Sequence, residues 1–235
     1  MENNKDLGMP IAIVISGILI SASIYATGGI KIINGQIDGE ANAREAVAQE
    51  IVVRPVDKND HIVGKIDAEV MIITYTDIEC PFCKRFHTTM GQIMDKYRAD
   101  GKVAWVYRQM PLDMLHSNAR KEAEATECAS IVGGNIKFWE YMNKLFAYTK
   151  SNDGLELSLL PKIASEIGLD TIAFENCMNG EKGKNAVKDD ESGAVPAGAK
   201  GTPYSIVMTK DGKKIPIDGA MPYETIKATI DSLLK

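Results

Sequence analysis

The sequence predicts an α/β fold in which helices cover a sheet that contains parallel strands. Three observations predict it. A strand–helix–strand pattern opens the domain, a long helical section follows, and two more strands and a helix close the chain. We expect the first two strands to pair in parallel, because the helix between them carries the chain back along the sheet.

An uncharged apolar run, Met9–Ala26, precedes this domain. A bilayer-spanning helix needs roughly 17–25 apolar residues, so the run is long enough to span. A signal peptide wants a basic leader and a clear cleavage site, and the run has neither. We therefore expect residues 1–6 to be a short cytoplasmic tail and residues 7–27 a retained transmembrane anchor, with a cleaved signal peptide as the alternative.

The rest of the chain divides into a tether and one domain. Residues 28–60 are mostly polar, with scattered glycines, and we expect them to be a linker. Residues 61–235 are expected to form the domain, with the helical insertion at about residues 113–198. The chain has 235 residues, of which 45% are hydrophobic and 25% charged, which suits one globular domain with additional segments.

The domain opens with two β-rich runs around a helix. Glu69–Tyr75 is short, apolar and rich in β-branched residues, which indicates a buried strand. Apolar residues recur at helical spacing from Pro81 to about Ala99. Lys102–Arg108 indicates a second strand.

Helical patterns then dominate. We expect helices over residues 117–131, 137–148, 157–167, 170–178 and 182–193, with Gly133–Gly134 separating the first two. Tyr204–Met208 is expected to be a strand, joined by an Asp211–Gly212 turn to a short strand at residues 214–217. Pro216 makes that strand an edge strand. A final amphipathic helix is expected over residues 222–234.

The chemistry is predicted by Cys80–Pro81–Phe82–Cys83, which follows a buried strand and opens a helix. A C-x-x-C in this setting indicates a redox pair. Pro81 suits the first helical position, where its missing N–H costs nothing. Free N–H groups at the helix start favour a thiolate on Cys80, which we expect to be exposed and to attack, while the deeper Cys83 resolves the mixed disulfide.

Other interpretations of these cysteines fit less well. The chain has four cysteines and three histidines, and Cys128, Cys177 and the histidines His61, His87 and His116 lack the spacing of a zinc site. We expect no metal. A passive disulfide across so short a loop would add little stability. The net charge of −5 and the lack of a basic stripe or a nucleotide-binding glycine loop predict no nucleic-acid partner and no cofactor.

From about His61 to Lys235 the sequence resembles the DsbA-like branch of the thioredoxin superfamily. The resemblance lies in the segment from Asp77 to His87, in Tyr107–Leu112 followed by His116 and Ala119, in Lys137–Glu140, and in Gly201–Tyr204 at the start of a strand. It implies a thioredoxin-like fold with a helical insertion.

The resemblance also assigns residues. It implies a cis peptide bond between Thr202 and Pro203, close to Cys80, and a substrate-binding role for Pro81, Phe82, Thr202 and Pro203. A proline at this place leaves the preceding backbone free to pair with a substrate chain.

One position departs from the family pattern. Many relatives carry a buried acid six residues before the first cysteine, where this chain has Thr74, so no general base is assigned. Asp77 and Glu79 lie nearer the cysteines, and we expect them to point elsewhere, because their charge would oppose a thiolate.

Cys128 and Cys177 have two open interpretations. They can be free core cysteines, which are common as small apolar residues. Some relatives carry a second, non-catalytic bridge, and neighbouring thiols outside the cytoplasm are usually oxidised. A disulfide requires their Cα atoms to lie within roughly 7 Å.

The resemblance implies an enzyme, a protein disulfide oxidoreductase. We expect a dithiol oxidase that introduces disulfides into exported proteins, with unfolded or partly folded chains and a membrane redox partner as its partners. Its location would be the cell membrane, single-pass, with the catalytic domain on the extracytoplasmic side. A reductase or isomerase with the same site, or a membrane-tethered binding or chaperone module with structural cysteines, are the alternatives.

Overall fold

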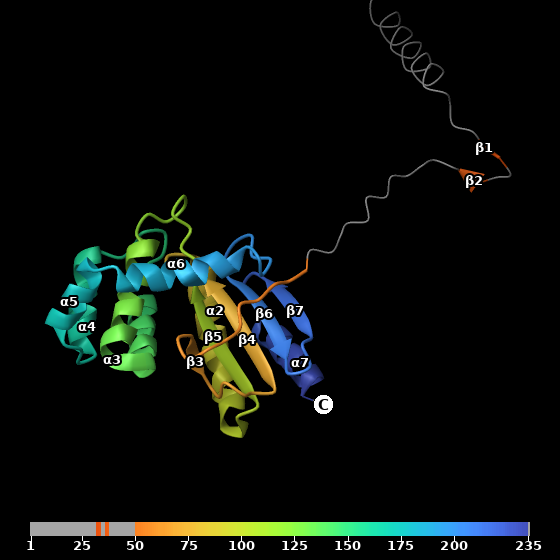
Figure 1. Cartoon of the computed structure of the whole chain (residues 1–235), viewed down its shortest axis with the longest axis horizontal. Coiled ribbons are helices and arrows are strands. Elements are labelled where there is room, and N and C mark those ends of the chain that lie inside the picture. Colours follow the sequence, from red (N-terminus) through yellow and green to blue (C-terminus); the bar gives the residue numbers. More distant parts are fainter. Residues whose placement is uncertain (1–31, 34–35, 38–49, 235) are drawn as a thin grey trace, which may run out of the picture. The chain divides into compact units, whose positions relative to one another are not determined.

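The computed structural model describes residues 32–33, 36–37 and 50–234. Two short antiparallel strands, β1 (Ile32–Ile33) and β2 (Gln36–Ile37), form a unit by themselves. The other described elements belong to a unit that begins at Glu50 (Figure 1). The predicted tail and anchor lie outside the described residues. Within the described part, no helix is both long enough and apolar enough to cross a membrane.

The larger unit is built on a five-stranded sheet with the order β3-β5-β4-β6-β7. As predicted, β4 (Val70–Thr76) and β5 (Val103–Gln109) pair in parallel. The strands β6 (Tyr204–Thr209) and β7 (Lys214–Asp218) continue the sheet in antiparallel fashion, with the proline-containing β7 at the edge. A short strand, β3 (His61–Val63), pairs antiparallel with β5 at the other edge and was not predicted.

Helices cover the sheet and form the insertion. α2 (Pro81–Tyr97) follows β4, and α7 (Tyr223–Leu233) packs beside α2. The insertion contains α3 (Ala119–Tyr148), α4 (Leu160–Glu166), α5 (Thr171–Asn179) and α6 (Lys182–Ala194), with short 3₁₀ turns at Arg98–Asp100 and Leu157–Leu159. Figure 1 shows α3, α4 and α5 to one side of the sheet, with α6 leading back to it. The thioredoxin-like arrangement with a helical insertion is confirmed.

The break predicted at Gly133–Gly134 is confirmed as a kink at Gly134, where two helices meet within α3. Gly134 has φ of 79° and ψ of −177°, and helix continues on both sides of it. Positive φ is a conformation that glycine adopts without the steric cost that a side chain would bring. The kink lets the second half of α3 turn its aromatic residues towards the sheet, where Phe138 stacks on His61.

The sheet has a core on each face. On one face Trp105 and Tyr107 of β5 pack with Phe86 and Met90 of α2 and with residues of the insertion and of α7. The other face carries Ile73, Tyr75 and Val106, which Ala194 and neighbouring residues cover. Every residue of β5 is buried, as expected for a central strand with both faces covered.

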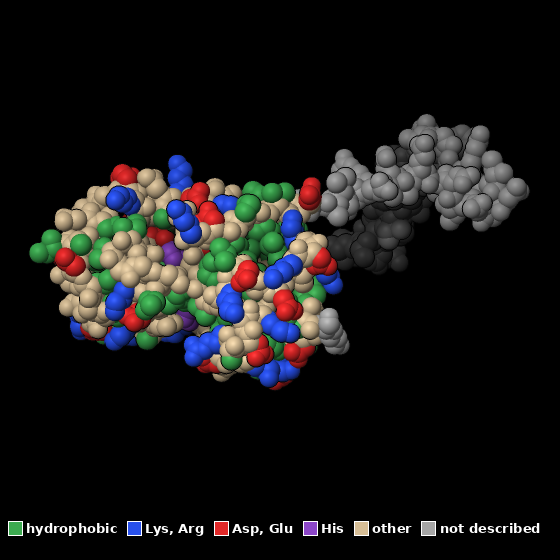
Figure 2. All heavy atoms as spheres, turned by 60° about the horizontal axis from the view of Figure 1, so that its bottom comes forward, with side chains coloured by type: hydrophobic (Ala, Val, Ile, Leu, Met, Phe, Trp, Pro, Cys, Tyr) green, Lys and Arg blue, Asp and Glu red, His purple; other side chains and the backbone are tan. Residues whose placement is uncertain are grey.

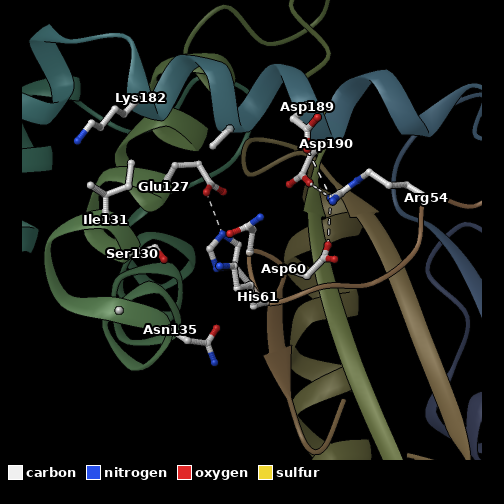
Figure 3. Close-up of a pocket in the computed structure, with 14 residues that line it drawn as sticks. Arg54, Asp60, His61, Glu127, Ser130, Ile131, Asn135, Lys182, Asp189 and Asp190 are labelled. Atoms are coloured by element: carbon white, nitrogen blue, oxygen red, sulfur yellow. Dashed lines mark hydrogen bonds and ion pairs between the residues drawn. The ribbon is translucent and has the colours of Figure 1, made fainter. Parts of the chain in front are cut away.

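The predicted end of the linker at residue 60 is wrong, because residues 50–60 pack on the domain. Ile51, Val53 and Val56 lie against the second core. Between them, the Arg54 guanidinium lies 3.1 Å from the Asp60 carboxylate and 2.8 Å from that of Asp190 on α6 (Figure 3). The alternation of apolar residues there follows a polar stretch and is too short to signal a strand, so sequence alone left it in the linker.

A buried ion pair stabilises this junction. The Arg108 side chain is fully buried, and its Nε lies 2.9 Å from Oδ1 of Asp60. The same guanidinium donates to the carbonyl oxygen of Arg54 at 3.0 Å and to the Tyr75 hydroxyl at 3.3 Å. These bonds tie residues 54–60 to the centre of the sheet.

Removing Arg108 should therefore destabilise the domain strongly. We expect Arg108→Met to lower the free energy of unfolding by about 3–5 kcal/mol, because it removes the fully buried cation from the Asp60 carboxylate and leaves it only the more exposed Arg54. Urea unfolding of the variant measures the loss. Arg108→Met combined with Asp60→Asn should recover part of it, and a loss below about 1 kcal/mol in the single variant would place this pair among weak surface bridges instead.

Candidate active site

The two cysteines of the C-x-x-C motif lie at the start of α2, as the sequence predicts. Cys80 is the N-cap residue, with extended backbone (φ −75°, ψ 121°), and Pro81 lies in the first turn. Both are free thiols. Cys80 is only 5% exposed and Cys83 only 1%, so the prediction of an exposed Cys80 is wrong. The loop before β6 lies against it, with the Cys80 sulfur 3.5 Å from the carbonyl oxygen of Thr202.

The environment shifts the pKa values of the two thiols in opposite directions. A hydrogen bond from Cys83 lowers the pKa of Cys80 to about 6 against the effect of burial, with further bonds from the backbone N–H groups of Cys83 and Phe82 and from Thr202. Burial raises the pKa of Cys83 well above its ordinary value, and the charge of Cys80 raises it further. Cys80 is therefore the thiolate at neutral pH and Cys83 the protonated thiol.

The Thr202–Pro203 peptide bond is cis, as the resemblance implies. Its place beside Cys80 follows from the 3.5 Å contact between the Cys80 sulfur and Thr202 O. Pro203 is buried, whereas Phe82 on the opposite side of the site is 53% exposed. Within residues 50–234, the Thr202 N–H makes no backbone hydrogen bond, which leaves it available to an extended chain.

Asp77 lies directly at the start of α2, so the expectation that it points elsewhere is wrong. It is 1% exposed, and its Oδ1 accepts hydrogen bonds from the N–H groups of Glu79 at 2.8 Å and Cys80 at 3.1 Å. Its Oδ2 accepts from Leu112 N–H at 2.7 Å and lies 3.1 Å from His116 Nδ1. An Asp whose side chain bonds the backbone two and three residues on is a common turn, and this spacing was the signal in the sequence.

Thr74 holds a neutral pair at the position where many relatives have an acid. Its hydroxyl lies 3.0 Å from that of Ser205 on β6 and accepts from Trp105 Nε1 at 3.1 Å. The three side chains satisfy one another in the core beneath α2. Position 74 therefore offers no carboxylate to exchange a proton with the thiols.

Buried carboxyls occur nearby instead, on Glu79 and Glu122. Glu79 does point away from the thiols, as expected, and accepts from the Thr149 hydroxyl at 2.7 Å and Gly154 N–H at 3.0 Å. Glu122 on α3 is fully buried, and neither of its oxygens has a donor among the described residues. Burial first, and then the neighbouring Glu79, raise the pKa of Glu122 to about 10. Glu122 is thus a neutral acid that can donate its proton to the Glu79 carboxylate.

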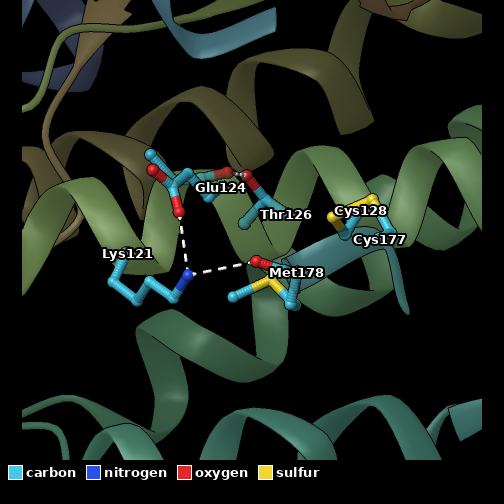
Figure 4. Close-up of a disulfide and its surroundings, with 7 residues drawn as sticks. Lys121, Glu124, Thr126, Cys128, Cys177 and Met178 are labelled. Carbon is cyan, nitrogen blue, oxygen red and sulfur yellow. Dashed lines mark hydrogen bonds and ion pairs between the residues drawn. A yellow bond between two sulfur atoms is a disulfide. The ribbon is translucent and has the colours of Figure 1, made fainter. Parts of the chain in front are cut away.

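Cys128 and Cys177 form a disulfide, with their Cα atoms 5.6 Å apart (Figure 4). The bridge joins α3 to α5 within the insertion. Close by, Lys121 Nζ donates to Glu124 Oε2 at 3.0 Å and to the Met178 carbonyl oxygen at 3.3 Å, which joins the same two helices. These contacts stabilise the insertion and involve neither thiol of the C-x-x-C motif.

The remaining candidates lie apart from the thiols. His87 is half-buried among aromatic rings and bonds Asn143, at 2.7 Å from its Nε2. Among the described residues, no cluster of three or more potential ligands is placed to hold a metal ion. Lys and Arg are intermixed with Asp and Glu on the face that Figure 2 shows. The chemistry of the site is accordingly that of the two thiols.

Comparisons with known proteins agree with this geometry. Residues 56–232 match the thioredoxin family model. The structure is similar to that of Pseudomonas aeruginosa DsbA2, with 28% identity, 74% of this chain and 94% of that chain covered, and a TM-score of 0.62. It shares its fold with BdbD from Bacillus subtilis, at 24% identity, 78% and 97% coverage, and a TM-score of 0.65.

Curated relatives include much longer proteins. The Na(+)/H(+) antiporter NhaA 1 of Mycobacterium sp. (strain KMS) is 33% identical over 180 residues, which are 75% of this chain and 28% of the relative. That of Mycolicibacterium gilvum is 31% identical over 162 residues, 68% of this chain and 25% of the relative. The chain thus spans about a quarter of these relatives. It belongs to the thioredoxin family.

The acidity of Cys80 can be measured directly. We expect the thiolate absorbance of the reduced protein to appear with a midpoint of about pH 6 and to vanish in Cys80→Ser. Cys83→Ala should raise the midpoint, because it removes the hydrogen bond that lowers the Cys80 pKa most. A wild-type midpoint near the ordinary value of about 8.5 would contradict the assignment.

Glu122 should make stability depend on pH. In the unfolded chain its carboxyl ionises near the ordinary 4.5, whereas the folded state keeps the proton to about pH 10. The unfolded state therefore loses this proton first, and stability falls as pH rises between these values. Urea unfolding between about pH 5 and pH 9 should show this fall in the wild type and a much weaker one in Glu122→Gln. Equal slopes in both proteins would contradict it.

Proposed function

We propose that this member of the thioredoxin family is a dithiol oxidase that introduces disulfides into exported proteins through Cys80 and Cys83. The observation that supports this direction most is the difference between the two thiols. A Cys80 with a pKa of about 6 is a stabilised thiolate at neutral pH, which favours the reduced form of the pair. A pair whose reduced form is stabilised is a strong oxidant.

The reaction needs only the two cysteines and a substrate dithiol. A substrate thiolate attacks the Cys80 sulfur, the Cys80–Cys83 bond breaks, and Cys83 leaves with the electron pair and takes up a proton. The second substrate thiolate then attacks the first substrate sulfur, and Cys80 leaves as a thiolate. The substrate gains a disulfide, and the enzyme gains the two electrons.

Apolar side chains surround the site and suit an unfolded chain. Phe82 is 53% exposed, and the loop that Asp77 holds beside Cys80 presents Met114 at 96% and Leu115 at 71% exposure. Exposed apolar residues gathered at one place mark interaction sites. Pro81, Phe82 and the Thr202–Pro203 edge would contact the substrate beside the disulfide, and Met114 and Leu115 would extend that surface.

Location and partners form part of the same proposal. The enzyme would be anchored by residues 7–27, with its domain on the extracytoplasmic side, where exported proteins fold. The Cys128–Cys177 disulfide supports an oxidising compartment. A membrane redox partner would reoxidise the dithiol after each turnover.

The reduction potential of the Cys80–Cys83 pair tests the proposed direction. Equilibration of the protein with glutathione buffers should give a value near about −120 mV, as for strong oxidants. A value near about −270 mV would identify a reductase with the same site and overturn the direction. Cys80→Ser should abolish all exchange, and activity that survives in this variant would favour a binding or chaperone module.

The apolar surface can be separated from the chemistry. We expect Met114→Ser combined with Leu115→Ser to lower kcat/KM for a reduced, unfolded polypeptide about tenfold, because each exposed apolar side chain loses its contact with the substrate. The rate with a small dithiol should stay unchanged, since that substrate does not reach the loop. An equal loss with both substrates would show that the two residues act on the thiols instead.

A further inference from the structure

The loop between β5 and α3 is joined to the reactive cysteine through one carboxylate. Asp77 Oδ2 accepts from Leu112 N–H at 2.7 Å and lies 3.1 Å from His116 Nδ1. Asp77 Oδ1 accepts from Cys80 N–H at 3.1 Å. The backbone N–H of His116 also donates to the Leu112 carbonyl oxygen at 2.9 Å, which closes a turn in the loop. His116 therefore lies two hydrogen bonds from the backbone of Cys80.

The negative charge of Asp77 opposes a thiolate on Cys80, and a positive charge on His116 would offset it. Asp77 is 1% exposed, and a buried negative charge beside a cysteine disfavours its thiolate. His116 is 7% exposed. Its burial would lower its pKa, but the bond to Asp77 and the charges of Asp77, Cys80 and Asp153 outweigh burial and raise the pKa of His116 above its ordinary value.

The surroundings of His116 are acidic on both sides. Asp77 and Cys80 face it from the start of α2, and Asp153 faces it from the loop after α3. Asp153 is itself held by Ser117 N–H at 3.0 Å and Asn118 N–H at 2.9 Å, in the residues that follow His116. The charges that act most strongly on His116 are therefore all negative.

We propose that His116 is a positioning residue for thiol–disulfide exchange, which as an imidazolium on Asp77 balances the charge of that carboxylate and stabilises the Cys80 thiolate. The inference rests on the proposed function, in which Cys80 leaves as a thiolate when the substrate disulfide forms. His116 acts through Asp77 and takes no part in bond making. Because coupling between sites is reciprocal, His116 must hold its proton more tightly when Cys80 is a thiolate than when it is in the disulfide.

A pair of variants separates charge from hydrogen bonding. His116→Gln keeps a donor towards Asp77 but carries no charge, and His116→Ala removes both. We expect both variants to raise the midpoint of Cys80 thiolate formation by about one pH unit, which is a tenfold change in equilibrium. The equilibrium constant with glutathione should fall about tenfold, or about 30 mV in potential. His87→Gln, on the same helix as the thiols but bonded to Asn143, is the matched control and should change neither value.

The outcomes are distinct. If His116→Gln behaves as the wild type while His116→Ala shifts, the hydrogen bond matters and the charge does not, which overturns the proposal. If neither shifts, the histidine has no role at the thiols. Failure of the proposed function would appear in the wild type itself, as a reduction potential of about −270 mV for the Cys80–Cys83 pair.

A measurement on the unaltered protein guards against variants that fail to fold. The chain has three histidines, so the His116 ring can be followed by NMR through a pH titration. Its pKa should be higher in the dithiol form than in the disulfide form. Equal values in the two redox forms would overturn the proposal.

Discussion

The Asp77 carboxylate is the constraint on which the active site depends. It is buried, and it accepts hydrogen bonds from three backbone N–H groups, of Glu79, Cys80 and Leu112, besides its contact with His116. The bonds to Glu79 and Cys80 hold the turn between β4 and α2. The bond to Leu112 holds the loop between β5 and α3 against this turn. A buried carboxylate is costly unless it is bonded in this way. The same bonds that lower that cost place Cys80 at the N-terminus of a helix, where a thiolate is favoured.

The site lacks the buried acid that many relatives carry beneath the cysteines. Thr74 and Ser205 fill that position with neutral hydroxyls. A buried carboxyl with a raised pKa is found instead on Glu122 of the insertion, next to Glu79. The raised pKa keeps the Glu122 carboxyl neutral, and Glu79 accepts hydrogen bonds from Thr149 and Gly154. The charge that matters beside Cys80 is therefore that of Asp77, and its nearest counter-charge is on His116.

Local patterns predicted the elements that build the site, and the family resemblance predicted that Thr202–Pro203 lies beside Cys80, whereas other contacts distant in sequence were not predicted. β4, α2 and the C-x-x-C motif follow from the apolar run, the helical spacing and Pro81, all within thirty residues of one another in the printed sequence. The packing of residues 50–60 depends on Arg54 meeting Asp190, which lies 136 positions further on. Likewise, β3 has only three residues and pairs with β5 by virtue of the sheet beside it. The burial of Cys80 was missed although Thr202–Pro203 was expected beside it, because the helix start alone indicates an exposed thiol and the extent of covering depends on the packed loop.

Because the loop that covers Cys80 follows the insertion, the helical insertion is part of the active site. The loop that carries Leu112 and His116 leads into α3, and the loop that carries Thr202 and Pro203 follows α6. Both ends of the insertion thus lie against the thiols. Two acids of the insertion fix it to the sheet: Glu127 bonds His61 and Gln109, and Asp190 bonds Arg54 and the Gln109 backbone. Burial raises the pKa of Asp190 to about 7, with Glu127 adding to the effect, so the charge of this carboxyl changes around neutral pH. Since the insertion holds both loops, contacts far from Cys80 determine the geometry in which its sulfur meets a substrate.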